Sequence, residues 1–217
     1  DTVGITNCDN DAAGELEIPA EIDRKPVTSI GDCAFFSCSS LTEITIPDRV
    51  TSIGVQAFQE CNSLIEITIP DSVTSIEMYA FSNCTSLTKI MMSDSVTTIG
   101  DCAFVDCSSL TEITIPDSVT SIGGLAFSGT PWLTAKQSEN PLVIINHILI
   151  DGTTCTGSVV IPDNVTNIGV SAFSGCSSLT EITISDSVTS IGALAFSDCT
   201  SLTEIMISNN VTNIGDC

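Results

Sequence analysis

The stretch from Leu41 to Ser63 reads LTEITIPDRVTSIGVQAFQECNS, and the next stretch, from Leu64, reads LIEITIPDSVTSIEMYAFSNCTS. The period is 23 residues. Further copies begin at Leu87, Leu110, Leu179 and Leu202. Self-similarity at a fixed period of about 20 to 50 residues is typical of stacked coils. The sequence therefore predicts one continuous solenoid instead of two globular domains.

Each unit, numbered from its leucine, predicts two extended runs. Glu43, Ile44, Thr45 and Ile46 alternate polar and apolar, which indicates a strand with one buried face. A proline and a turn follow the first run. The second run ends at an isoleucine, and a glycine comes next. We expect a positive φ at this glycine, which is Gly54 in the first of these units, and at its equivalents. The isoleucines at positions 4 and 13 and the phenylalanines at position 18 should form ladders, in which equivalent residues of successive coils stack.

The stretch from Leu133 to Cys155 is irregular. It keeps the length of 23 residues but puts Lys136 and Ser138 where isoleucine is expected. We expect a degenerate coil in phase with the others, with Ile145 in the position-13 ladder. A short protruding hairpin around Asn146 and His147, with Trp132 packed nearby, is predicted in it. Such a feature is either a binding landmark or a packing variation of the repeat.

The unit LTEITIPDSVTSIG followed by AFSxCSS closely resembles the BspA-like (Treponema-type) leucine-rich repeat family, from about Leu16 onward. The resemblance implies an α/β, β-rich leucine-rich-repeat solenoid, a right-handed stack of 23-residue coils with short helical turns. We expect a single domain over 1–217: an irregular coil at 1–40, regular repeats at 41–132, a degenerate coil at 133–155 and regular repeats at 156–217. The last unit stops unfinished at Cys217, so we expect the chain to be a piece of a longer protein.

The charge balance limits the partners. Five basic and 27 acidic residues give a net charge of −22, which repels nucleic acid and anionic membranes. The 42% of hydrophobic residues still supplies a core. The one histidine, His147, has no Ser or Cys at a recognisable spacing, and the carboxylates recur in ladders. The sequence therefore predicts neither an enzyme nor a cofactor.

A repeated aspartate raises the question of calcium. Asp48 and its equivalents Asp71, Asp94 and Asp117 should stack about 5 Å apart and repel one another. Hydrogen bonds from turn amides would offset the repulsion, and weakly bound calcium is the alternative.

The cysteines also follow the repeat. Six share position 21 and should stack side by side as free, buried thiols, since parallel side chains suit a disulfide poorly. They are Cys38, Cys61, Cys84, Cys107, Cys176 and Cys199. Cys8 and Cys155 are expected outside this ladder, and their pairing is left open.

The exposed strand positions are the expected binding surface. Ile65, Lys89 and Met91 depart most from the repeat, either as a distinctive patch or by sequence drift. The candidate partner-binding residues are Glu43, Thr45, Ile65, Glu66, Thr68, Lys89, Met91, Glu112, Thr114, Trp132 and His147. From the resemblance we expect an extracellular or cell-surface scaffold that binds a protein ligand. A passive spacer in a larger secreted protein, for example a polysaccharide-degrading assembly, is the alternative.

Overall fold

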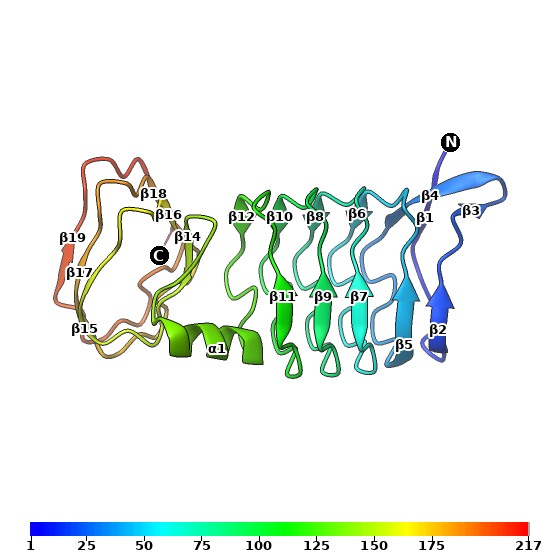
Figure 1. Cartoon of the computed structure of the whole chain (residues 1–217), viewed down its shortest axis with the longest axis horizontal. Coiled ribbons are helices and arrows are strands. Elements are labelled where there is room, and N and C mark those ends of the chain that lie inside the picture. Colours follow the sequence, from blue (N-terminus) through cyan, green and yellow to red (C-terminus); the bar gives the residue numbers. More distant parts are fainter. Residues whose placement is uncertain (217) are drawn as a thin grey trace. The chain divides into compact units, whose positions relative to one another are not determined.

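The computed structural model describes residues 1–216, and Cys217 lies outside the described residues. The chain forms two compact units, Asp1–Thr134 and a second one from Ala135 onward. Each is a stack of coils (Figure 1), and equivalent strands pair at a separation of 23 residues. The solenoid predicted from the sequence is confirmed. The single domain over 1–217 stays a prediction.

The first unit contains two sheets, one for each strand of the coil. The sheet of first strands has the order β11-β9-β7-β5-β2. Its strands are β2 (Ala13–Glu17), β5 (Ser40–Thr45), β7 (Glu66–Thr68), β9 (Lys89–Met91) and β11 (Glu112–Thr114). The sheet of second strands has the order β1-β4-β6-β8-β10-β12. Its strands are β1 (Val3–Ile5), β4 (Lys25–Ile30), β6 (Ser52–Ile53), β8 (Ser75–Ile76), β10 (Thr98–Ile99) and β12 (Ser121–Ile122).

The second unit repeats this arrangement with fewer coils. Its first strands are β15 (Gly157–Val160), β17 (Leu179–Thr183) and β19 (Glu204–Met206). The other sheet has the order β13-β14-β16-β18-β20. Its strands are β13 (Val143–Ile145), β14 (Ile148–Asp151), β16 (Asn167–Ile168), β18 (Ser190–Ile191) and β20 (Asn213–Ile214).

The core of each unit lies between its two sheets and consists of the predicted ladders. Ile67 is in register with Ile90, and both are buried. The phenylalanines stack face to face, with ring centroids 5.0 Å apart for Phe35 and Phe58 and 5.6 Å apart for Phe104 and Phe127. Because each coil covers the apolar side of the next, burial is shared by the whole stack.

The return side of each coil is a series of tight turns where short helical turns were expected. Phe36 N–H bonds to Cys33 O, three residues back, while Phe35 N–H bonds to Ala57 O in the next coil. Cys33 and Ser37 have φ values of 56° and 58°, and their equivalents in later coils are also left-handed. Left-handed residues interrupt a right-handed helix, so the turns link neighbouring coils instead of forming a helix.

The position-14 glycines do not have the predicted positive φ. The close approach of neighbouring coils favours glycine at this position. A Cβ on Gly123 would lie 2.3 Å from the backbone nitrogen of Asp101. Where Glu77 occupies this position, its N–H lies 3.4 Å from Ile53 O, whereas Gly123 N lies 2.8 Å from Ile99 O. The hydrogen bond between coils is thus longer at Glu77, which has a side chain, than at Gly123, which has none.

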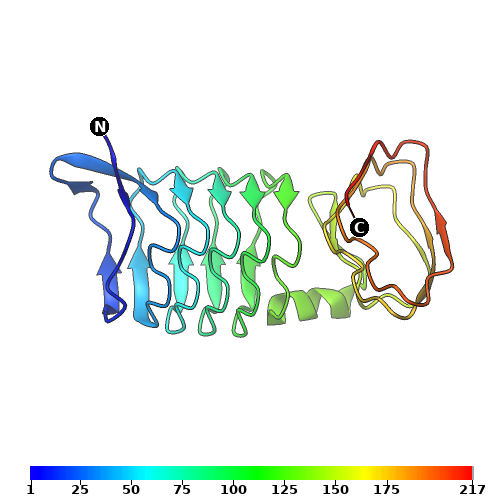
Figure 2. The same cartoon turned by 180° about the vertical axis from the view of Figure 1, so that it is seen from behind.

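The irregular first coil contains an insertion between β2 and β4. It forms a small antiparallel hairpin of β3 (Glu21–Ile22) and β4. Asp23 and Arg24 in its turn have φ values of 51° and 64°. Positive φ at both central residues is the requirement of a type I′ hairpin turn. The loop projects from the first coil (Figure 2).

The irregular stretch begins with a helix that the sequence did not predict, α1 (Pro131–Glu139). Thr130 caps it, because its Oγ1 accepts a hydrogen bond of 3.1 Å from the N–H of Leu133. Pro131 occupies the first helical position, where a missing N–H costs nothing. The boundary between the two units falls inside α1.

The hairpin predicted around Asn146 is confirmed, but it does not protrude. β13 and β14 pair antiparallel, and β14 then pairs parallel with β16 inside the sheet. Leu149, and not Ile145 as predicted, is in register with Ile168. The hairpin replaces an ordinary coil, so Ile145 lies on the reversed edge strand, opposite Ile148.

Candidate binding surface

The outward side of the first-strand sheet of unit 1 presents an in-register row of charged residues. Consecutive members of the row are Glu15, Glu43, Glu66, Lys89 and Glu112. Strand alternation directs these side chains to solvent while the isoleucines between them point to the core. Four carboxylates and one ammonium make the row acidic.

A second outward row lies two residues further along each strand. Thr68, Met91 and Thr114 are in register on β7, β9 and β11, and Thr45 on β5 pairs with Glu17 on β2. Met91 is 39% exposed. Ile65 directly precedes β7 and is 52% exposed. The structure therefore places nine of the eleven candidate partner-binding residues on or directly beside this sheet.

Lys89 forms one long, solvent-exposed ion pair within the sheet. Its Nζ lies 3.7 Å from Glu112 Oε2, and the two side chains are 42% and 70% exposed. An ion pair this exposed contributes little to folding, because water screens it. Both side chains remain accessible to a partner.

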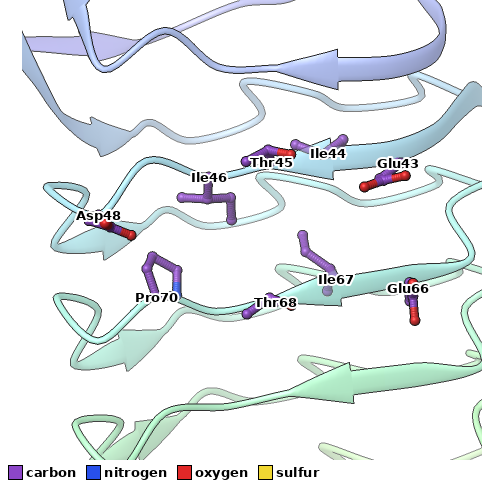
Figure 3. Close-up of a pocket in the computed structure, with 9 residues that line it drawn as sticks. All are labelled: Glu43, Ile44, Thr45, Ile46, Asp48, Glu66, Ile67, Thr68 and Pro70. Atoms are coloured by element: carbon purple, nitrogen blue, oxygen red, sulfur yellow. The ribbon is translucent and has the colours of Figure 1, made fainter.

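A groove opens between β5 and β7 (Figure 3). The ladder between these strands has the single register pair Glu43 and Glu66, whereas β7 and β9 share three pairs. The groove has a volume of about 290 Å³. Its lining residues are Glu43, Ile44, Thr45, Ile46, Asp48, Glu66, Ile67, Thr68 and Pro70.

The groove combines an apolar wall with acidic ends. Figure 3 shows Glu43 and Glu66 at one end and Asp48 at the other, with Ile46 and Pro70 between the strands. Ile46, Asp48 and Pro70 were not among the candidate partner-binding residues, and Asp48 was considered only for calcium. The same residue types recur in the coil from Leu110 as Ile115, Asp117 and Pro116, so they gave no sequence signal for this one pair of coils.

Two predicted residues lie away from this surface. Trp132 is only 7% exposed, and its ring packs on Phe127 with centroids 4.8 Å apart. It therefore closes the phenylalanine ladder of unit 1 and presents little surface to a partner. His147 lies in the exposed β13–β14 turn of unit 2, with Nδ1 2.8 Å from Asn164 O.

The aspartates of the calcium prediction are all solvent-exposed. Asp48, Asp71, Asp94 and Asp117 follow the first strands of their coils, where water and salt screen their repulsion. Across residues 1–216, no three or more His, Cys, Asp or Glu side chains are grouped so as to hold a metal ion. Weak calcium binding stays a prediction. Within the same residues, no helix is long and apolar enough to cross a bilayer.

Solved structures of bacterial leucine-rich repeat proteins resemble the chain. A leucine-rich repeat protein of T. pallidum is 29% identical with a TM-score of 0.60, over 92% of this chain and 82% of that one. One from Eubacterium ventriosum is 25% identical with a TM-score of 0.50, over 94% and 62%. The pneumococcal vaccine antigen PcpA, at 20% identity and a TM-score of 0.53 over 98% and 70%, shares the fold.

A comparison with curated proteins found no match. A family model described as a BspA type leucine-rich repeat region, however, matches residues 28–149 and 150–217 in six copies. The match covers most of the chain and agrees with the 23-residue register of both units. The chain therefore belongs to the BspA-type leucine-rich repeat family.

Proposed function

We propose that the chain is a binding scaffold of the bacterial cell surface or the extracellular space, and that it recognises a protein through the first-strand sheet of unit 1. The observation that carries the proposal is the groove between β5 and β7, set among two in-register rows of exposed side chains. A sheet fixed by a packed core holds the backbone of these residues in place without a partner, which lowers the entropic cost of binding.

The proposed partner is a basic protein segment. Lys or Arg side chains of the segment would reach Glu43 and Glu66, and an apolar side chain would enter the groove beside Ile46. The net charge of −22 would steer such a segment toward the chain and repel acidic ones.

The test is a peptide-display selection against the parent chain, followed by affinity measurements on two double variants. Glu43→Lys with Glu66→Lys reverses the charge of the groove. We expect it to weaken binding of the selected peptides by at least about tenfold, or about 1.4 kcal/mol. Glu181→Lys with Glu204→Lys is the matched control, because these neighbours occupy the same repeat position in unit 2 and change the net charge equally. Equal affinities for the two double variants would refute the groove as the site.

The alternative is the passive spacer in a larger secreted protein. The uniform register of the strands favours it, since most coils present nearly the same outward residues. If the selection recovers no peptide that distinguishes the parent from the groove variant, the spacer function is supported.

A further inference from the structure

The cysteine ladder of unit 1 differs at its N-terminal end. Cys61, Cys84 and Cys107 are buried, and each donates a thiol hydrogen bond to a phenylalanine carbonyl of the preceding coil. The S···O distances are 3.2, 3.1 and 3.0 Å. These three thiols therefore each have a close acceptor inside the core.

Cys38, the first member of the ladder, has different surroundings. It donates to Asp9 O at the longer distance of 3.8 Å, and Cys8 donates to the same oxygen at 3.6 Å. The two thiols therefore converge on one carbonyl oxygen. Cys8, expected outside the ladder, thus lies beside its first residue.

Of the two thiols, only that of Cys8 is accessible from solvent. Cys38 is fully buried, whereas Cys8 is half-buried and lies on the segment between β1 and β2. A small reagent can reach the Cys8 sulfur from solvent. Cys33 is exposed nearby in sequence, but its thiol contacts Gln56 Oε1 in the next coil.

We propose that Cys8 and Cys38 form a disulfide by exchange with a low-molecular-weight disulfide. The Cys8 thiolate attacks one sulfur of the reagent, which breaks its S–S bond and releases one small thiolate. Cys38 then loses its proton to water and attacks the Cys8 sulfur, which forms the protein disulfide and releases the second small thiolate. Two protein thiols are oxidised, and one small disulfide is reduced to two thiols.

The electrostatics of the pair favour the second step once the first has occurred. Burial raises the pKa of Cys38 to about 12, and the charge of a Cys8 thiolate and the hydrogen bond to Cys8 contribute to the rise. A mixed disulfide at Cys8 removes both contributions. Burial, which is the largest cause of the raised pKa of Cys38, remains, so the mixed disulfide lowers this pKa only in part.

The disulfide would tie the segment between β1 and β2, which holds Cys8, to the segment between β4 and β5, which holds Cys38. β1 is the edge of the second-strand sheet and β2 the edge of the first-strand sheet. The bond would close a loop from Cys8 to Cys38 that contains β2, β3 and β4. Such a cross-link limits opening of the coil that holds the edge strands β1 and β2.

The experiment treats the whole chain with oxidised glutathione, blocks the remaining thiols and maps the linked peptides by mass spectrometry. We expect one linked pair, Cys8 with Cys38, and a mass lower by about 2 Da than that of the reduced chain. Amides of β1 and β2 should then exchange at least about fivefold more slowly in the oxidised chain.

Two variants complete the test. Cys8→Ser should lose both the link and the slower exchange, and Cys33→Ser should retain both. Links that leave out Cys8, a glutathione adduct that persists on Cys8, or unchanged exchange in β1 and β2 would each overturn the proposal.

Discussion

At the scale of single residues, the buried thiols serve as hydrogen-bond donors to backbone carbonyls between coils. Cys61 is fully buried and donates to Phe35 O. Burial raises its pKa from 9.0 to about 12, with a further contribution from the neighbouring Cys38. The folded chain therefore holds this proton at pH values where the unfolded chain releases it.

We expect the free energy of unfolding to fall as the pH rises from 9 toward 12. A thiol whose pKa is higher in the folded state contributes its full stabilisation below pH 9 and loses it as the pH approaches the folded value. One such thiol accounts for a slope of up to about 1.4 kcal/mol per pH unit. Urea unfolding at pH 8 and at pH 10 measures the change.

The contribution of Cys61 can be separated by substitution. Cys61→Ala should lower the stability at pH 8 and flatten its dependence on pH, because one of the buried titrating groups is gone. Cys33→Ala removes an exposed thiol and should leave the slope unchanged. Identical slopes for the parent and both variants would contradict this account.

At the scale of the elements, the C-terminal half of α1 is anchored by a buried carboxylate. Asp151 on β14 is 9% exposed, and its Oδ1 accepts a 2.9 Å hydrogen bond from Gln137 Nε2. Thr153 donates to the same carboxylate through both its backbone N–H and its hydroxyl. The helix, the strand and the following turn thus share one polar centre.

Gln137→Ala should destabilise unit 2 by about 1 to 2 kcal/mol, because it removes a donor to a charged group. It should also speed exchange of the Asn140 amide, which closes the last helical turn on Lys136 O. Lys136→Ala is the control, since its 3.0 Å ion pair with Glu139 is exposed and should contribute under about 1 kcal/mol. Equal losses in the two variants would argue against the anchor.

The repeat allowed some elements to be predicted and concealed others. The alternation of Glu43 to Ile46 predicted β5 and its register because each coil is paired with a near copy of itself. Thr130 and Pro131 were a readable helix start, but the preserved length of 23 residues favoured a degenerate coil. No sequence pattern indicated the groove, since Ile44 and Thr45 recur as Ile67 and Thr68. The groove arises because β5 and β7 share a single register pair, and the sequence does not reveal this difference in pairing.

At the scale of the whole molecule, each unit should respond to damage as a cooperative body. Ile90→Asp places a charge at a site that is 1% exposed, on β9, which lies between β11 and β7 in the five-stranded sheet of unit 1. We expect a loss of roughly 4 kcal/mol or more. Amides throughout residues 1–134 should then exchange at one common rate by hydrogen exchange and mass spectrometry.

The control for Ile90→Asp is Met91→Asp, the next residue on β9, which points outward and is 39% exposed. It should cost less than about 1 kcal/mol. Rapid exchange confined to β9 in the Ile90 variant would show that the coils do not depend on one another for burial.

The contact between Trp132 and Phe127 makes Trp132 an intrinsic fluorescence probe of unit 1. The sequence has a single tryptophan, and its indole lies at the end of the column of phenylalanine rings in unit 1. A red shift of its emission therefore signals solvent entry at that end of the column, with no dye attached. Melting followed by indole fluorescence thus describes unit 1, and the second unit needs a different spectroscopic label.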